Sequence, residues 1–204
     1  MNYFVTGIGT NVGKTIVSAI LTEALEADYW KPIQAGDLEN SDSLKIESLI
    51  SNSTTKIHPE AYRLNQPMSP HAAAKLDNIN IDLDKIVLPK TTNNLIIEGA
   101  GGLMVPLNEK ELVIDLIKKL DAEVILVSQN YLGSINHTIL SYETLKNKQI
   151  NIAGIIFNGQ ENAATEQFIL NYTKLPLIAR IQQHDYMDKN VILHYKNQLS
   201  FHAK

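Results

Sequence analysis

One glycine-rich stretch near the N-terminus decides the fold of this chain: Gly7-Ile8-Gly9-Thr10-Asn11-Val12-Gly13-Lys14-Thr15. A short β-rich run, Asn2 to Thr6, precedes the stretch, and apolar residues recur at helical spacing from Val17 to Ala24 after it. Strand, glycine loop and helix, in that order, form the context that a phosphate-binding loop requires. We therefore predict an amphipathic helix from Lys14 to about Glu26 that begins at the loop.

The residue types of this loop suit a nucleoside triphosphate. Glycines let successive backbone N–H groups turn toward phosphate oxygens, and the N-terminus of the following helix adds partial positive charge. Lys14 can bridge the terminal phosphates, and Thr15 offers a hydroxyl to Mg²⁺. Gly7 and Gly13 are separated by one residue more than in the usual pattern. The alternative is a glycine turn that only joins a strand to a helix, but Gly-Lys-Thr after a strand favours triphosphate binding.

Further apolar runs predict the rest of the sheet. They cover Tyr29–Ile33, Leu95–Ile97, Val124–Val127 and Ile152–Phe157, with a shorter candidate after Pro176. Segments with helical periodicity separate these runs, for example the one that contains Val113, Leu116, Ile117 and Leu120. The alternation predicts an α/β fold with a mostly parallel sheet, helices on both faces and the three-layer α/β/α architecture of P-loop NTPases.

The composition indicates a folded globular protein. Of its 204 residues, 44% are hydrophobic and 20% are charged, which is far from the composition of a disordered chain. The formal net charge of -4 is too acidic for a protein that binds phosphate backbones by counterion release, so we expect no nucleic acid partner. The absence of cysteine excludes disulfides, thiolate zinc sites, iron–sulfur clusters and a cysteine nucleophile.

The distribution of residues along the chain predicts a single cytoplasmic domain, residues 1–204, with no membrane partner. Met1 to Gly7 contain no basic segment, and no later segment approaches the roughly 18 apolar residues of a membrane span. No repeat, low-complexity tract or linker divides the chain. Asn52 to Leu88 is polar and irregular enough to be an insertion over the edge of the sheet, and the last twenty residues, from Asp185, give a weak helical signal.

Two carboxylates are candidates for the metal site of a phosphoryl-transfer enzyme. Such groups usually lie at the carboxyl ends of parallel strands. Glu98 follows the run Leu95–Ile97 and precedes Gly99-Ala100-Gly101-Gly102, which would let the chain lie close to bound phosphates. An exposed carboxylate at a strand end is the alternative. Asp42 lies in Asn40-Ser41-Asp42-Ser43, a cluster that by itself is typical of a helix cap.

Lys31 stands near the end of the second predicted strand, in Lys31-Pro32-Ile33-Gln34-Ala35-Gly36. A lysine at a strand end is usually a solvated residue. Because Pro32 restricts the chain after it, Lys31 could instead place a second positive charge opposite Lys14, where a phosphate and a second anion would meet. The spacing allows either interpretation.

An ordered series of motifs gives the chain a resemblance to a known family. They are the loop Gly7–Thr15, followed by Lys31–Gly36, Ser41–Ser43, Ser69–His71, Glu98–Gly102 and Leu132–His137. Together they resemble dethiobiotin synthetase, over roughly the first 160 residues. Members of that family also have the longer gap in the phosphate loop, so the departure from the usual pattern supports the resemblance.

The resemblance implies an ATP- and Mg²⁺-dependent ligase of biotin biosynthesis. The substrates would be ATP, CO₂ and 7,8-diaminononanoate, and the products dethiobiotin, ADP and phosphate. A carbamate on one substrate amine would attack the γ-phosphate, and the second amine would close the resulting carbamic–phosphoric anhydride into a cyclic urea. The protein would chiefly position charges.

The resemblance also implies roles for individual residues. Lys14 would hold the phosphates, Lys31 would stabilise the carbamate and the transferring phosphoryl group, and Thr10 would contact the reacting groups. The groups around Mg²⁺ would be Thr15, Asp42 and Glu98. The nucleotide-binding residues would be Gly9, Thr10, Asn11, Val12, Gly13, Lys14, Thr15 and Asn158, the last of these at the position that reads adenine. Outside the resemblance, Asn158 and the following glycine are typical of a turn.

The segment Leu132–Asn136 resembles the family's site for the substrate carboxylate, which is contributed across the interface of a homodimer. The substrate-binding residues would be Gly133, Ser134, Ile135 and Asn136, together with Lys31. Backbone donors at a helix N-terminus could receive a carboxylate. An ordinary Ser-capped helix is the alternative.

The chain departs from the family pattern at two positions of these motifs. Asn11 stands where familiar members carry an acidic residue, and Ala35 where many carry a hydroxyl, so contacts from both positions are lost or rearranged. Beyond about Ala163 the resemblance thins, which leaves the pocket for the nucleotide base open. His71 and His137 fall in matched motifs, and we interpret both as structural residues.

Two other classes of nucleotide-binding protein compete with this interpretation. A dimeric partitioning-type ATPase uses a related fold as a switch, but that class carries a second lysine early in the loop, where this chain has Gly9. In a GTPase, the segment Asn147-Lys148-Gln149-Ile150 would need an aspartate for guanine, which it lacks. A nucleotide-binding interaction module would leave Lys31, Asp42 and Glu98 without a shared purpose.

Overall fold

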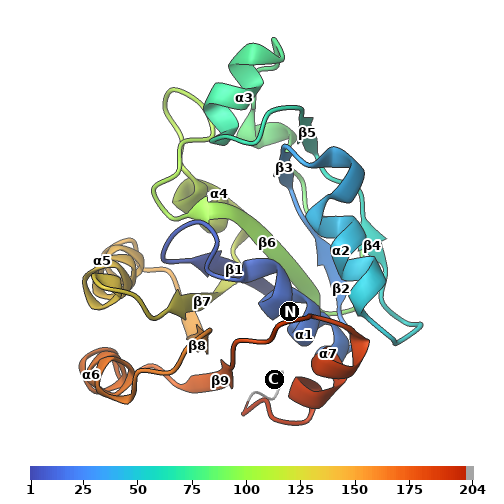
Figure 1. The fold of residues 1–204 in the computed structure, drawn as a ribbon. Helices are drawn as coiled ribbons and strands as arrows, with labels where there is room; N and C mark the ends of the chain where they lie inside the picture. The colour runs from blue at the N-terminus through green and yellow to red at the C-terminus, as the bar shows by residue number, and fades with distance from the viewer. Residues whose placement is uncertain (201–204) are drawn as a thin grey trace.

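A seven-stranded parallel sheet forms the centre of the computed structural model, which describes residues 1–200 (Figure 1). The strand order is β4-β2-β6-β1-β7-β8-β9. The bounds of these strands are β1 Asn2–Gly7, β2 Asp28–Trp30, β4 Ile57–His58, β6 Leu95–Gly102, β7 Glu123–Gln129, β8 Ile152–Asn158 and β9 Leu177–Ile181. All of the strand pairs are parallel, which confirms the predicted fold class.

Side chains alternate along the strands between two hydrophobic clusters. On β1, Tyr3 and Val5 belong to one cluster and Phe4 to the other, because successive side chains of a strand point to opposite faces. The continuous apolar runs in the sequence are therefore strands covered on both sides, as parallel strands normally are.

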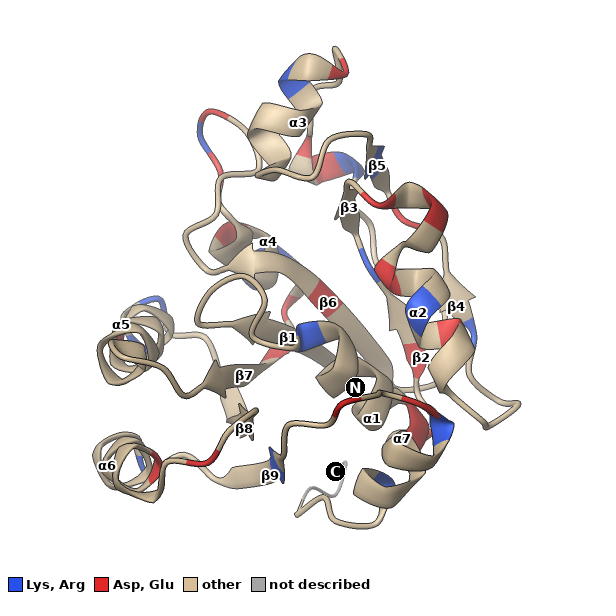
Figure 2. Cartoon of the chain, in the orientation of Figure 1, with Lys and Arg blue, Asp and Glu red and all other residues tan. Residues whose placement is uncertain are grey.

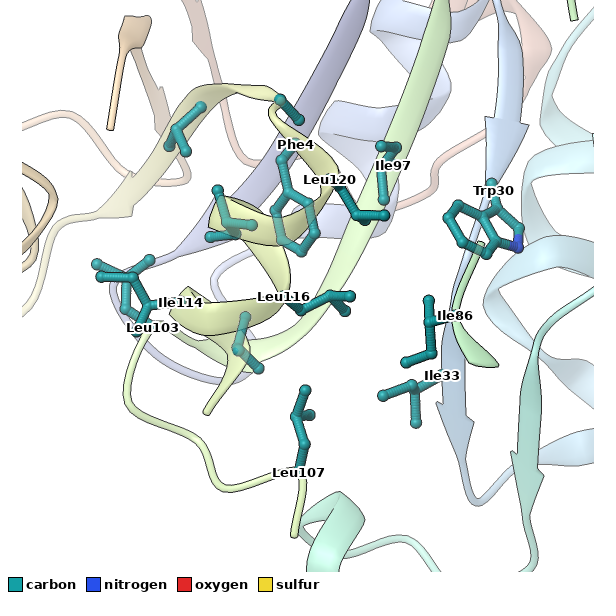
Figure 3. Close-up of a cluster of buried hydrophobic side chains, with 14 of the residues drawn as sticks. Phe4, Trp30, Ile33, Ile86, Ile97, Leu103, Leu107, Ile114, Leu116 and Leu120 are labelled. Atoms are coloured by element: carbon teal, nitrogen blue, oxygen red, sulfur yellow. The ribbon is translucent and has the colours of Figure 1, made fainter. Parts of the chain in front are cut away.

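Three helices cover each face of the sheet, which gives the predicted three layers (Figure 1). On one side lie α1 (Lys14–Leu25), α2 (Asp42–Leu49) and α7 (Lys189–Lys196); on the other lie α4 (Val113–Leu120), α5 (Ser134–Asn147) and α6 (Ala163–Thr173). In Figure 3, Leu120 of α4 lies beside Phe4 and Ile97, Leu116 lies one turn earlier on the same side of the helix, and Ile114 lies next to Leu103.

The run Tyr29–Ile33 is not one strand, which corrects the prediction. Strand β2 ends at Trp30, and β3 (Ile33–Ala35) pairs with β5 (Tyr62–Leu64) in a separate two-stranded sheet. Pro32 has no N–H to donate to a ladder, and its carbonyl accepts hydrogen bonds from the N–H groups of Ala61 and Tyr62, where β5 begins. The chain therefore leaves the central sheet at Lys31.

The polar segment Asn52 to Leu88 is more regular than the sequence suggests. It supplies β4, which is itself the edge strand of the central sheet, and then β5, the helix α3 (Pro70–Leu76) and the short 3-10 helix η2 (Leu83–Lys85). The other short 3-10 helix, η1 (Leu38–Asn40), precedes α2. Together β3, β5 and α3 form a small unit beyond the strand end where β2 stops (Figure 1).

The weak helical signal after Asp185 corresponds to α7, which packs on α1 through the buried residues Ile192 and Tyr195. Residues 201–204 of that segment lie outside the described part of the chain. Acidic and basic residues are interspersed along the chain (Figure 2). Within residues 1–200, no helix combines the length and the apolar character that crossing a membrane requires.

Candidate active site

A cavity of about 1040 Å³ opens at the carboxyl ends of β1, β2 and β6. The phosphate loop forms one wall, with Thr10, Asn11, Gly13, Lys14 and Thr15. The turn before α3 forms another, with Pro67, Met68, Ser69 and Pro70. Lys31, Asp42 and Glu98 also line the cavity. The structure thus brings Lys31 and the predicted metal residues together with the phosphate loop from four separate stretches of sequence.

The phosphate loop leads into α1 through a glycine whose backbone has the left-handed conformation. Gly13 has φ +89° and caps the N-terminus of α1, and a Cβ at this position would lie 2.1 Å from Nδ2 of Asn158. The same Nδ2 atom donates a hydrogen bond to the carbonyl of Val12 at 3.0 Å. Asn158 therefore supports the backbone of the loop from the end of β8, whatever else its amide contacts.

The glycines after Glu98 bring β6 against the phosphate loop. A Cβ at Gly102 would lie 3.2 Å from the carbonyl oxygen of Gly7, which is tighter than ordinary packing. Thr10 lies beside this run, because a Cβ at Gly101 would come within 3.6 Å of its hydroxyl. The sequence interpretation, in which these glycines allow a close approach to the site of the phosphates, agrees with this packing.

Lys14 folds back over the phosphate loop. Its Nζ donates to the carbonyl of Gly9 at 3.1 Å, and the residue is only 8% exposed. Burial is the largest influence on this group and lowers the pKa of Lys14 to about 8, with a smaller contribution in the same direction from the charge of Lys31. An incoming phosphate would reverse this effect by stabilising the ammonium form.

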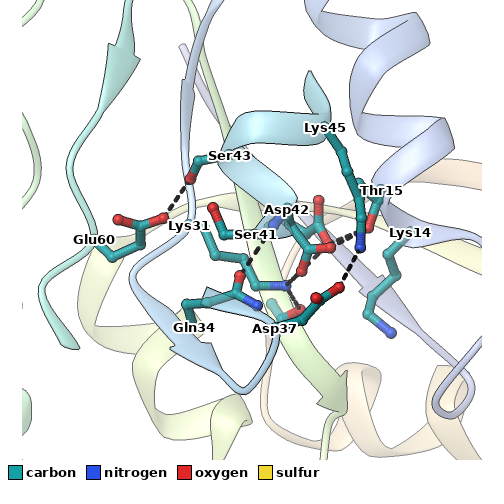
Figure 4. Close-up of polar contacts among 12 residues, drawn as sticks. Lys14, Thr15, Lys31, Gln34, Asp37, Ser41, Asp42, Ser43, Lys45 and Glu60 are labelled. Atoms are coloured by element: carbon teal, nitrogen blue, oxygen red, sulfur yellow. Dashed lines mark hydrogen bonds and ion pairs between the residues drawn. The ribbon is translucent and has the colours of Figure 1, made fainter. Parts of the chain in front are cut away.

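Lys31 lines the cavity between the carboxylates of Asp42 and Glu98, and Figure 4 shows it beside Asp42. Its Nζ is 2.6 Å from Oδ2 of Asp42 and 3.0 Å from Oε1 of Glu98. Burial alone would lower the pKa of Lys31, but the two carboxylates outweigh it and raise the pKa. Burial would likewise raise the pKa of Asp42, and the neighbouring Lys31 lowers it instead. Both members of the pair are therefore charged at neutral pH.

The hydroxyl of Thr15 connects the phosphate loop to both carboxylates. Its Oγ1 lies 3.0 Å from Oδ1 of Asp42 and 3.0 Å from Oε1 of Glu98. One hydroxyl has a single hydrogen to donate, so it can satisfy only one of these acceptors at a time. The arrangement leaves carboxylate lone pairs directed at the space next to Thr15.

Asp42 is the first residue of α2 and does not cap it. Ser41 is the cap: its side chain accepts from the N–H of Leu44 at 3.4 Å. The carboxylate of Asp42 is thereby free to point at Thr15 and Lys31, while Gln34 of β3 accepts from its backbone N–H at 3.3 Å. The cap interpretation of the Ser/Asp cluster holds for the serine and is wrong for the aspartate.

Tyr29 is a residue of the site that the sequence analysis did not single out. It is completely buried on β2, and its hydroxyl donates to Oε2 of Glu98 at 2.9 Å. Burial and the nearby charge of Glu98 raise the pKa of Tyr29 well above 10, so the hydroxyl keeps its proton. The available signal was the spacing, because Tyr29 and Lys31 stand two residues apart in an extended segment and such side chains share a face.

The donor set of the site fits a small, hard cation. A hydroxyl and two carboxylates supply only oxygen, which Mg²⁺ prefers, and Mg²⁺ is normally held by one or two carboxylates plus the phosphates of the substrate. Among the described residues there is no group of three or more His, Cys, Asp or Glu side chains that could hold a metal ion without such help. The site therefore suits a metal ion that arrives with a nucleotide.

The predicted carboxylate-binding segment lines a different cavity, of about 460 Å³. Gly133 (φ +104°) and Ile135 lie on one side of it and Gln160 to Asn162 on the other. Gly133 is the cap residue of α5, so the Ser-capped helix considered from the sequence is not formed. Ser134 is buried and Asn136 is exposed. Within one chain, this segment and the phosphate loop line separate cavities.

The remaining residues of the matched motifs contribute in other ways. The side chain of Val12 is buried in the core, so only its backbone belongs to the loop. Asn11 adopts a left-handed conformation (φ 60°) and is exposed at the cavity. His137 bonds to the hydroxyl of Tyr131 at 2.8 Å, and the backbone N–H of His71 donates to Pro106.

Solved structures of two ATPases share the fold of this chain. A cell division ATPase MinD from Pyrococcus furiosus superimposes with a TM-score of 0.63 at 12% identity, covering 97% of both chains. A ParA family ATPase from Chlorobium tepidum gives a TM-score of 0.60 at 13% identity, covering 97% of this chain and 99% of its own. The AAA domain family model matches residues 1–191. Fold and site together define a P-loop nucleotide-binding protein.

Relatives with higher sequence identity show which family of nucleotide-binding proteins the chain belongs to. The ATP-dependent dethiobiotin synthetase BioD of Christiangramia forsetii is 57% identical over 95% of this chain and 93% of its own. The enzyme of the same name from Cytophaga hutchinsonii is 52% identical, covering 97% and 96%, and that of Chlamydia pneumoniae is 48% identical, covering 95% and 87%. This chain belongs to the dethiobiotin synthetase family.

Proposed function

We propose that this chain, as a single domain, is an ATP-dependent ligase that closes a cyclic urea on 7,8-diaminononanoate with CO₂, giving dethiobiotin for biotin biosynthesis. Its relatives at 48% identity and above bear the name of that enzyme and match nearly the whole chain. The observation on which the proposal chiefly rests is the position of Lys31. Its ammonium lies on the floor of the phosphate-loop cavity, where a triphosphate and a second anion can meet.

The chemistry requires ATP because a carbamate oxygen is a poor leaving group. One substrate amine adds to CO₂ and loses a proton, which forms the carbamate. A carbamate oxygen then attacks the γ-phosphorus, the bond from the γ-phosphorus to its bridging oxygen breaks, and ADP leaves. The second amine attacks the carbonyl carbon of the mixed anhydride, phosphate leaves with the former carbamate oxygen, and the released proton goes to solvent.

In this reaction, the residues of the chain hold the reactants in place and stabilise negative charge. Lys14 and the backbone N–H groups of Gly9 to Thr15 would hold the phosphates, and Thr10 would contact the reacting groups at the edge of the loop. Lys31 would stabilise the negative charge of the carbamate and of the phosphoryl group in transfer. Asn158 would lie near the base, where its present contact with Val12 leaves its amide carbonyl available.

Thr15, Asp42 and Glu98 would hold Mg²⁺ against the nucleotide. When bound, the ion neutralises charge on the β- and γ-phosphates. Lys31 is the cation that forms ion pairs with Asp42 and Glu98. Lys31, Asp42 and Glu98 would therefore change their ionic partners when the metal–nucleotide complex binds.

We further propose that the active site is shared between two copies of the chain in a homodimer. Gly133, Ser134, Ile135 and Asn136 would receive the substrate carboxylate at the N-terminus of α5. In support of this arrangement, the segment and the phosphate loop line separate cavities within one chain, and a second subunit would bring the segment to the diamine.

The assay that tests this function measures ATP consumption and dethiobiotin formation together. The protein is supplied with ATP and Mg²⁺, and the diamine and bicarbonate are added separately and then jointly. The proposal predicts that ADP appears only when both are present, in equal amount to dethiobiotin. ATP turnover that does not respond to the diamine would instead favour the partitioning-type switch and overturn the proposal.

A further inference from the structure

The two oxygens of Glu98 have different partners. Oε1 faces the cavity, where Lys31 Nζ and Thr15 Oγ1 each lie 3.0 Å from it. Oε2 faces the interior, where the hydroxyl of Tyr29 donates to it at 2.9 Å. Glu98 is 1% exposed and Tyr29 is fully buried, so water does not compete for the contact. Contacts to both oxygens therefore hold the carboxylate of Glu98 in one orientation.

The position of Tyr29 explains why this orientation is rigid. Tyr29 lies on β2 in register with Ile96 of β6, two residues before Glu98, so the two side chains start from adjacent strands. Its ring packs in the hydrophobic cluster beneath α1 and α2. A ring fixed by packing gives its hydroxyl little freedom, and the hydrogen bond transmits that restriction to the carboxylate.

This arrangement bears on which cation the site accepts. Ca²⁺ takes six to eight oxygen ligands and readily binds a carboxylate through both of its oxygens, whereas Mg²⁺ is smaller and takes single oxygens in an octahedral arrangement. The buried phenol holds Oε2 of Glu98 away from the cavity, so Oε1 is the oxygen that a cation in the cavity meets. Such a ligand suits Mg²⁺ and disfavours Ca²⁺.

We infer that Tyr29 is a positioning residue that makes Glu98 a one-oxygen ligand and thereby selects Mg²⁺ over Ca²⁺ at this site. The inference rests on the proposed metal site and adds a determinant of its selectivity. Tyr29 is not among the residues that line the phosphate-loop cavity, and its hydroxyl acts through Glu98.

The test uses Tyr29→Phe, which keeps the ring and removes the hydroxyl. Metal-dependent binding of ADP is measured by calorimetry with Mg²⁺ and with Ca²⁺, so no turnover is needed. The wild-type protein should bind ADP more tightly with Mg²⁺ than with Ca²⁺. In the variant Oε2 becomes available, and the ratio of the two affinities should fall about tenfold, the lower end of what losing a partner of a metal ligand costs.

The matched control is Tyr195→Phe. Tyr195 is also buried, and its hydroxyl lies 2.9 Å from the backbone N of Gln182 and 2.8 Å from Nε2 of His184. The substitution removes both contacts. Tyr195 lies on α7, away from Asp42 and Glu98. This control should keep the wild-type ratio. An unchanged ratio in Tyr29→Phe would overturn the role of Tyr29 and leave the metal site standing, whereas ADP binding that ignores both metals in the wild type would overturn the metal site itself.

A structure of the wild-type protein with ADP and Mg²⁺ keeps the inference testable if Tyr29→Phe does not fold. The hydroxyl of Tyr29 should still donate to Oε2 of Glu98 in that complex, with the metal or its bound water on the Oε1 side. A metal bound through Oε2, or through both oxygens, would overturn the inference.

Discussion

Lys31, which is buried, and Asp42, which is partly exposed, form an ion pair with 2.6 Å between Nζ and Oδ2. The proposed reaction needs the charge of each residue for a different partner. Asp42 would serve the metal ion, and Lys31 the carbamate and the phosphoryl group. In the ion pair, the two opposite charges compensate each other. A largely buried pair of this kind is costly to break from one side, because the remaining charge is left without compensation.

Replacing Lys31 should separate catalysis from nucleotide binding. In Lys31→Met we expect dethiobiotin formation to fall by about 100- to 1000-fold, the usual effect of removing one group that stabilises charge in a transition state. Binding of ADP with Mg²⁺ should be retained or strengthened, because Asp42 and Glu98 lose the cation that competes with the metal. Single-turnover product formation and calorimetry measure the two quantities. A variant that makes dethiobiotin at the wild-type rate would rule out the assigned role.

The low pKa of Lys14 predicts proton uptake when the nucleotide binds. In the free protein the pKa of Lys14 is about 8, so above that pH the side chain is largely neutral, and bound phosphates favour its charged form. Affinity for ADP should fall with rising pH above about 8, by up to about tenfold per pH unit. Calorimetry in two buffers of different ionisation enthalpy should report uptake of a proton.

The control for this prediction is Lys14→Met, which should bind more weakly and lose the dependence on pH. Its turnover should also collapse, since the missing contact is worth on the order of 3 kcal/mol at a transition state. Nucleotide binding without proton exchange above pH 8 in the wild type would contradict the explanation.

The sequence predicted the nucleotide end of the site because local patterns define it. The loop Gly7–Thr15 joins a strand to a helix, and this context alone places Lys14 and Thr15 at a helix N-terminus. The same patterns place Glu98 directly after an apolar run, but the strand end expected there is wrong, because β6 continues through the glycines to Gly102. These predictions depend only on neighbours in the chain, where spacing and propensity are informative.

Long-range relations could not be predicted in the same way. The order of strands, which puts β6 between β1 and β2, follows from how the crossovers pack and left no local signal. The break in the run Tyr29–Ile33 could have been read from Pro32, which cannot donate within a ladder. The contact of Tyr29 with Glu98 joins residues 69 apart in sequence, and only the tertiary structure reveals it.

A mixed dimer tests whether the site is shared. Asn136→Ala should weaken the use of the diamine while ADP binding survives, and Lys31→Met should be inactive for a different reason. If each site uses Lys31 of one subunit and Asn136 of the other, a dimer with one variant chain of each kind contains one intact site. At a diamine concentration too low for Asn136→Ala alone to turn over, mixing the two variants in equal amounts should therefore restore dethiobiotin formation. The rate should reach about a quarter of the wild-type rate per site, because half of the dimers are mixed and each of these has one intact site of two.

The control for the mixed dimer is each variant incubated alone at the same total concentration, which should show no recovery. Mixing that restores nothing, although the subunits exchange, would place both residues in the same subunit's site. Loss of ADP binding in Asn136→Ala would indicate a folding defect instead.

Glu23 makes a pH-dependent contribution to stability. Its buried Oε2 accepts hydrogen bonds from the N–H groups of Ser51 and Asn52 at 2.7 and 3.0 Å, which hold the loop before β4 to α1. Burial alone would raise the pKa of Glu23, but these hydrogen bonds outweigh it and hold the pKa below 4.5. The stabilisation is therefore complete above that pH and is lost as the pH falls through the pKa of the folded protein.

The substitution Glu23→Gln should lower the free energy of unfolding by about 1–3 kcal/mol at neutral pH, the cost of weakening buried hydrogen bonds to a charged group. In urea unfolding, the difference from the wild type should shrink as the pH is taken below 4.5. Glu26→Gln, at the exposed end of the same helix, should change stability little at either pH. A difference for Glu23→Gln that stays constant with pH would exclude the charged hydrogen bonds as its source.

The most direct measurement of the central claim follows an oxygen atom from CO₂ to phosphate. Diaminononanoate, ATP and freshly prepared bicarbonate labelled with oxygen-18 are given to the protein, and the phosphate released in the first turnovers is analysed by mass spectrometry. If a carbamate attacks the γ-phosphorus, each phosphate will contain one labelled oxygen for every dethiobiotin formed. Phosphate that contains only oxygen from ATP and water would show that ATP is hydrolysed rather than used to activate a carbamate, and would contradict the account.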